Sequence, residues 1–156
     1  MTVAKPVPDE KHALSPYLIV DGAAKAIEFY AAVFGAKELY RLSDPSGKIG
    51  HAELQIGACR FMLADEYPDF GALGPITVGG SPVSIHLYVE DVDLIVSRAT
   101  TAGATLLRPI EDEFFGDRVG LVTDPFGHKW HLATRKEDVS PEDMQKRMDA
   151  AYQTVA

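Results

Sequence analysis

Two histidines, a tyrosine and a methionine occupy matching positions in two similar stretches of the chain. Tyr17 and Met62 in the first stretch lie 69 residues before their counterparts in the second, His86 and His131. A histidine near its ordinary pKa of about 6.5 can donate, accept or exchange a proton. A phenol adds a further hydrogen-bonding group, and methionine adds adaptable apolar surface. These residues predict a pocket for a small molecule, and the alternative is ordinary filling of a sheet face.

The similarity between the two stretches extends well beyond these four positions. Residues 15–21 (SPYLIVD) resemble 84–90 (SIHLYVE), and 60–65 (RFMLAD) resemble 129–134 (KWHLAT), both at an offset of 69. A repeat of this length differs from solenoid and propeller repeats, which run roughly 20–50 residues. We therefore expect two similar units, with a pocket where equivalent strands face each other.

Hydrophobic spacing predicts the same order of elements in both units. Each unit is expected to contain a strand, a helix and three further strands, in the order βαβββ. In the first unit the predicted strands span 17–20, 38–43, 50–56 and 59–64, with a helix over 23–34; in the second they span 83–89, 105–109, 118–123 and 129–134, with a helix over 92–101.

Three segments lie outside the repeated units. Residues 1–12 are polar and predict a flexible N-terminal tail, and residues 67–82, rich in glycine and proline, predict a linker. The run Ser140-Pro141-Glu142-Asp143 has the cap, proline and acidic residues that begin a helix, so a C-terminal helix is expected within 138–156. One face of that helix is apolar and carries Met144, Met148 and Tyr152.

Composition limits the classes of partner. The chain has 156 residues and a formal net charge of −8, which is unfavourable for binding nucleic acid or an anionic membrane surface. No apolar run approaches the roughly 20 residues that cross a bilayer, and the N-terminus lacks the apolar core of a signal peptide. We expect a cytoplasmic protein with no nucleic-acid and no membrane partner.

Several motifs of the chain resemble those of one known family. They are 15–18 (SPYL), 26–30 (AIEFY), 33–36 (VFGA), 89–93 (VEDVD), 124–130 (DPFGHKW) and 140–145 (SPEDMQ). Together they resemble the vicinal oxygen chelate superfamily, of glyoxalase, bleomycin-resistance and dioxygenase type, and its PhnB-like branch. The resemblance implies an α+β fold with one glyoxalase-like domain over 13–137. Its two tandem βαβββ units, about 14–66 and 83–135, would form half-open cupped sheets.

The resemblance also implies where a divalent metal would be held, on the first and last strands of each unit. These positions fall on Ser15, Met62, Ser84 and His131. Neutral alcohols and a thioether are poor ligands for a hard divalent ion, so only His131 suits the role. We therefore predict no metal and no other cofactor.

One alternative metal site is left open. His86 lies two residues after Ser84, a step of about 6.8 Å along a strand, whereas a Zn–N bond is about 2.1 Å. The imidazole would therefore have to lean far back to share an ion with His131. A displaced site would combine His86 and His131 with Glu53.

Three functions follow from the resemblance. The preferred one is a metal-independent small-molecule-binding protein of glyoxalase/bleomycin-resistance type, a homodimer holding its ligand in the cupped sheet. The alternative is a metal-dependent lyase, isomerase or dioxygenase using His86 and His131, so whether the protein is an enzyme stays open. A scaffold role is the third. The predicted pocket residues are Ser15, Tyr17, Met62, Ser84, His86 and His131.

Three large side chains near the predicted pocket are assigned mainly to packing. By strand alternation Trp130 points away from His131, towards the helix side of its sheet. Arg118 is expected to pair with the acidic run 111–113. Phe115 is a weaker candidate for the pocket.

The remaining histidines and the cysteine are expected to have no role in the site. His12 lies in the predicted tail, and His51 and His128 are expected to be solvated. Cys59 is predicted to be packed within a strand. A single cysteine cannot form an internal disulfide, which fits a reducing compartment.

Overall fold

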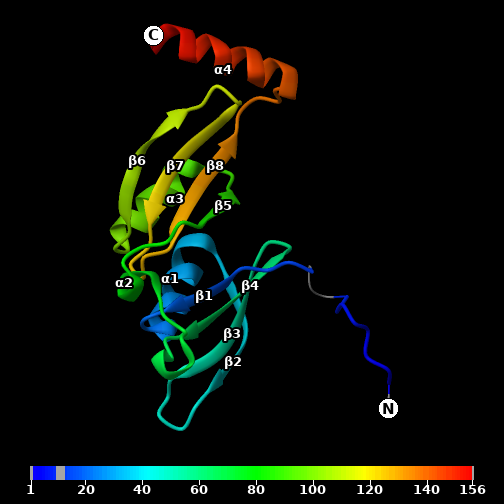
Figure 1. Ribbon diagram of the computed structural model, residues 1–156, viewed down its shortest axis with the longest axis vertical. Helices are drawn as coiled ribbons and strands as arrows, with labels where there is room; N and C mark the ends of the chain where they lie inside the picture. Colours follow the sequence, from blue (N-terminus) through cyan, green and yellow to red (C-terminus); the bar gives the residue numbers. More distant parts are fainter. Residues whose placement is uncertain (1, 10–12, 156) are drawn as a thin grey trace. The chain divides into compact units, whose positions relative to one another are not determined.

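Two four-stranded mixed sheets, each with one covering helix, make up most of the protein (Figure 1). The computed structural model describes residues 2–9 and 13–155, so His12 and part of the predicted tail lie outside it. The chain divides into two compact units, residues 1–82 with 125–128, and residues 83–124 with 129–156. The predicted α+β fold of tandem βαβββ units with a C-terminal helix is confirmed.

The first unit places its helix on one face of its sheet. Side chains alternate along a strand, so Leu18, Leu54 and Leu63 are buried on the α1 side with Tyr30 and Val33 of the helix. The sheet order is β1-β4-β3-β2, with β1 parallel to β4 and the other pairs antiparallel. The elements are β1 (Tyr17–Val20), α1 (Ala23–Phe34), β2 (Lys37–Ser43), β3 (Ile49–Ile56) and β4 (Cys59–Asp65).

The second unit repeats this topology with the order β5-β8-β7-β6. Trp130 is buried on the helix side as predicted, and its indole Nε1–H donates to Asp124 Oδ2 at 3.0 Å. Val96, Val122 and Leu132 complete the same layer. The elements are β5 (Ser84–Tyr88), α3 (Val92–Thr101), β6 (Thr105–Asp112), β7 (Asp117–Thr123) and β8 (Lys129–Arg135).

The start of each covering helix is held by a side chain at the same place in the repeat. Asp65 Oδ1 accepts from the backbone N–H of Gly22 at 3.1 Å and of Ala23 at 2.7 Å, and its Oδ2 accepts from Ile49 N at 2.8 Å. At the corresponding position, 69 residues later, Thr134 Oγ1 accepts from Val92 N at 2.9 Å. The capping groups thereby tie the last strand of each unit to its helix.

The linker, residues 67–82, contains two short helices that the sequence did not indicate. They are η1 (Pro68–Phe70) and α2 (Pro75–Val78), and each begins with proline. Gly71 and Gly79 follow them with φ of 72° and 96°, left-handed conformations that favour glycine. Helices of three and four residues are too short to produce a readable hydrophobic period.

The C-terminal helix α4 (Pro141–Val155) begins as predicted, with Ser140 Oγ accepting from Asp143 N at 3.2 Å. Arg147 joins it to the segment that follows β8, because its guanidinium contacts Glu137 at 2.7 Å. On its apolar face Met148 is 38% exposed and Tyr152 is 68% exposed. Among the described helices, none is long and apolar enough to cross a membrane.

Candidate functional site

Two equivalent rows of side chains cross the sheets on the faces opposite the helices. The backbone register aligns one residue from each of the four strands, and each row ends on an edge strand just after a bulge. In the first unit the row is Tyr17, Met62, Glu53 and Tyr40. In the second unit the row is His86, His131, Leu121 and Arg108.

The register corrects the predicted relation between the two histidines. His86 is the direct partner of His131 across the parallel β5–β8 pair, while Ser84 pairs with Lys129. Sequence spacing placed Ser84, rather than His86, at the position shared with His131, and the register shows the reverse. Ser15 precedes β1 in the other unit, so the two predicted serines lie outside both rows.

The two imidazole rings lie nearly parallel, with centroids 6.3 Å apart and an interplanar angle of 13°. His86 is exposed, and His131 is half-buried. Burial lowers the pKa of His131, and the neighbouring His86 and the Arg108 guanidinium lower that pKa further. His131 is therefore a neutral imidazole near pH 7, able to donate one hydrogen bond and accept another.

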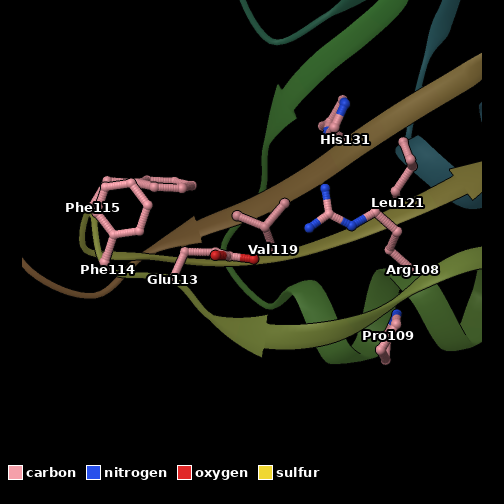
Figure 2. Close-up of a pocket in the computed structure, with 8 residues that line it drawn as sticks. All are labelled: Arg108, Pro109, Glu113, Phe114, Phe115, Val119, Leu121 and His131. Carbon is pink, nitrogen blue, oxygen red and sulfur yellow. The ribbon is translucent and has the colours of Figure 1, made fainter. Parts of the chain in front are cut away.

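A pocket of about 320 Å³ adjoins His131 on the same sheet (Figure 2). Its walls come from β6, β7, β8 and the turn that joins β6 to β7. Figure 2 shows the Arg108 guanidinium and the Glu113 carboxylate extending towards the same space. Among the described residues neither side chain has an ion-pair partner. The lining residues are Arg108, Pro109, Glu113, Phe114, Phe115, Val119, Leu121 and His131.

Only part of this pocket could have been found by the sequence argument. His131 was predicted, and Phe115 was a weaker candidate that does line the pocket. Arg108 was missed, although it lies 68 residues after Tyr40, close to the offset of the repeat. Glu113 and Phe114 lie in a turn that has no repeated motif to mark it.

A second polar group lies on the sheet of the first unit. Tyr17 Oη is 2.8 Å from His51 Nδ1, and His51 Nε2 is 3.2 Å from Tyr40 Oη. Tyr40 donates to Glu53 Oε2 at 2.9 Å, and Arg60 lies 3.4 Å from Glu53 Oε1. The prediction that His51 is solvated is wrong, because both of its ring nitrogens face phenols. Burial raises the pKa of Tyr17, which keeps its hydroxyl protonated.

Neither unit by itself supplies the three ligands of the predicted displaced metal site. His86 and His131 belong to the second unit, whereas Glu53 lies in the first, fully buried against Tyr40 and Arg60. Catalytic zinc sites use three protein ligands, and two imidazoles fall short of this. Within residues 2–9 and 13–155 no group of three or more His, Cys, Asp or Glu side chains is placed to hold an ion. Metal independence stays a prediction.

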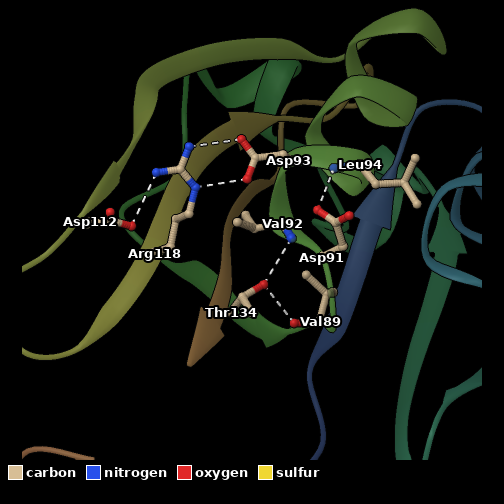
Figure 3. A network of polar contacts seen from close by, with 8 residues as sticks. All are labelled: Val89, Asp91, Val92, Asp93, Leu94, Asp112, Arg118 and Thr134. Carbon is tan, nitrogen blue, oxygen red and sulfur yellow. Dashed lines mark hydrogen bonds and ion pairs between the residues drawn. The ribbon is translucent and has the colours of Figure 1, made fainter. Parts of the chain in front are cut away.

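Three further side chains differ from their expected surroundings. Arg118 does reach the acidic run through Asp112 at 3.2 Å, but its main partner is Asp93, bound at 2.8 and 3.0 Å (Figure 3). His128 is half-buried rather than solvated, with Nε2 2.9 Å from Ile19 O. Cys59 is exposed, so its predicted packing is wrong.

Comparison with known proteins places the chain in a family. Residues 11–132 match the Glyoxalase/Bleomycin resistance protein/Dioxygenase superfamily, and the chain belongs to it. The uncharacterized protein Rv0887c of Mycobacterium tuberculosis is 45% identical over 141 residues, covering 88% of this chain and 83% of that protein.

Solved structures agree with this assignment. The structure of the Arabidopsis thaliana gene product At5g48480 is 29% identical with a TM-score of 0.63, covering 78% of this chain and 98% of that one. A PhnB protein from Bacillus cereus, described as a putative 3-demethylubiquinone-9 3-methyltransferase, is 18% identical with a TM-score of 0.64 and shows the same fold. It covers 79% of this chain and 99% of that one. The fold is therefore glyoxalase-like, as predicted.

Proposed function

We propose that the protein binds a small organic molecule in the pocket on the sheet of the second unit. The proposal rests on the composition of this pocket, in which Arg108 and neutral His131 lie beside apolar phenylalanine and leucine side chains. Ligand pockets are mostly apolar, with a few polar groups that orient the ligand. Membership of a family whose description includes bleomycin resistance proteins supports a binding role.

The lining residues favour an aromatic acid as the ligand. A guanidinium matches a carboxylate with two parallel hydrogen bonds, and the Arg108 guanidinium has no carboxylate partner within the described part of the chain. Phe114 and Phe115 lie with their centroids 5.3 Å apart and offer apolar surface to a ring. His131 can bond a neighbouring oxo or hydroxyl group in its neutral form.

Thermal shift and calorimetry with phenylpyruvate test this proposal. A ligand at about 100 times its Kd raises the free energy of unfolding by about 2.7 kcal/mol, so a clear rise in Tm is expected. Arg108→Gln should abolish the rise. Arg98→Gln, which removes an exposed arginine from α3, is the matched control and should preserve it. A rise that survives Arg108→Gln contradicts the proposed site.

The alternative, a metal-dependent enzyme, is favoured by one observation, the direct pairing of His86 with His131. We expect protein purified without chelator to contain well under one divalent metal per chain by elemental analysis. A stoichiometric metal that is lost in His131→Ala would instead support the enzyme.

We also propose that the protein is a homodimer, and the exposed apolar face of α4 supports this. Light scattering should give a mass near twice 17.0 kDa. Tyr152 is 68% exposed in the single chain. If α4 forms the interface, Tyr152→Asp should shift the mass towards that of one chain. A single-chain mass for the unmodified protein contradicts the dimer.

A further inference from the structure

A continuous chain of hydrogen bonds crosses the first unit's sheet from an exposed phenol to a buried carboxylate. It runs from Tyr17 through His51 and Tyr40 to Glu53, with donor–acceptor distances of 2.8, 3.2 and 2.9 Å. Tyr17 is 48% exposed, whereas Glu53 is fully buried. Arg60, 3.4 Å from Glu53 Oε1, supplies the compensating positive charge.

The chemistry of these groups sets the direction of each hydrogen bond. An ionised carboxylate only accepts, so the Tyr40 hydroxyl donates its single proton to Glu53. The Tyr40 oxygen then accepts from His51, which requires the tautomer with a proton on Nε2. A neutral imidazole in this tautomer has a lone pair on Nδ1, and Tyr17 donates to it. In each of these three hydrogen bonds the proton therefore points towards Glu53.

This order matches the arrangement by which enzymes activate a hydroxyl. A side chain that reacts lies within hydrogen-bond reach of a base, and a third group orients the base. Tyr17 occupies the reactive position, His51 is the base, and Tyr40 with Glu53 holds the imidazole in the required tautomer. Met62, which lies beside Tyr17 on β4, offers apolar surface next to the phenol.

We propose that Tyr17 is the acid–base group of a second site, which binds a phenol or enol and removes its hydroxyl proton. The ligand O–H bond breaks as its proton passes to Tyr17 Oη. Tyr17 passes its own proton to His51 Nδ1, where a new N–H bond forms. The ligand remains as an oxyanion that accepts a hydrogen bond from Tyr17. The imidazolium is stabilised by the Glu53 carboxylate through Tyr40.

The class of ligand follows from the strength of the base. A neutral imidazole can accept a proton from a phenol or an enol, which are much stronger acids than an alcohol. The residues of this site all belong to the first unit, and those of the aromatic-acid pocket all belong to the second. The inference therefore goes beyond the proposed function, and each can fail separately.

4-Nitrophenol is a direct probe, because its anion is yellow and its acid is colourless. We expect the bound phenol to ionise about one pH unit below the free phenol, a tenfold change in its acidity. In His51→Gln the bound phenol should titrate within a few tenths of a unit of the free one, while binding itself persists. Tyr17→Phe should lose the same shift. Arg98→Gln, which removes an exposed arginine from α3, is the control and should retain it.

Two results would overturn the proposal. One is a bound phenol whose ionisation is unchanged by His51→Gln, or is changed as much by the control Arg98→Gln. Absence of binding at high 4-nitrophenol concentration counts equally. The other is a measurement on the unmodified protein, so it does not depend on whether a variant folds. Side-chain ¹⁵N NMR should show His51 protonated at Nε2 and bare at Nδ1, and the opposite tautomer would reverse the inferred proton order.

Discussion

Asp65 should be one of the most important polar side chains for stability. Its carboxylate accepts three backbone hydrogen bonds, from Gly22, Ala23 and Ile49, and α1 has no other side-chain cap. Loss of a helix cap costs about 1 kcal/mol, and hydrogen bonds to charged groups contribute about 1.5–3 kcal/mol each. Because Asp65 is half-buried, we take the lower part of this range. Asp65→Ala should then lower the free energy of unfolding by about 3–5 kcal/mol.

The repeat supplies a matched control at Thr134. Its hydroxyl accepts from Val92 N and donates to Val89 O, as Figure 3 shows, while α3 keeps a second cap in Asp91, which accepts from Leu94 N at 3.1 Å. Thr134→Val should therefore cost only about 1–2 kcal/mol.

Chemical denaturation followed by far-UV circular dichroism measures both variants. For a chain of this length about 2–4 °C of Tm is lost per kcal/mol, so Asp65→Ala should melt roughly 6–20 °C lower. Fluorescence of Trp130, the single tryptophan, follows the second unit. A loss in Asp65→Ala no larger than that in Thr134→Val would refute the hydrogen-bond argument.

Two other predictions concern the second unit. Burial, His86 and Arg108 lower the pKa of His131 in the folded protein. The unfolded chain therefore binds a proton at His131 more tightly than the folded protein does. The free energy of unfolding should have its full value above about pH 6.5 and should fall as the pH drops below 6.5. In NMR titration Arg108→Gln should raise that pKa, and an unchanged value contradicts the assigned cause. Gly116 has φ of 97°, and a Cβ there would lie 2.5 Å from the Glu137 carbonyl oxygen, so Gly116→Ala should cost about 3 kcal/mol or more. Gly47→Ala, with φ of 89° and open space, should cost only about 1–2 kcal/mol, and equal losses would exclude the clash as the cause.

Much of the fold could be predicted because the sequence pattern of each helix and strand occurs in both units. The helix over 92–101 and the strand over 17–20 match the structure, since their apolar periods are clear. The strand predicted to end at Pro109 continues to Asp112. Proline normally ends a strand, but β6 is an edge strand of its sheet, where one missing N–H is tolerated.

The site was harder to predict, because contacts across a sheet depend on register. Measuring along one strand placed His86 about 6.8 Å from the expected metal position. Parallel pairing of β5 with β8 places it directly opposite His131. The sequence around His51 likewise gave no sign of its partners, because they too depend on register. Its partners Tyr17 and Tyr40 come from two other strands of the sheet, and Tyr40 follows a bulge that no local motif announces.

The two sheets have the same strand topology, but the side chains in their equivalent rows differ in chemistry. The bulge near the edge and the cap on the helix occur in both units, so these positions preserve the fold. The third position of the row is Glu53 in one unit and Leu121 in the other. A carboxylate there gives the phenols and His51 a fixed proton direction. Leucine there leaves Arg108 without an acidic neighbour in its row, so that its charge is available to a ligand.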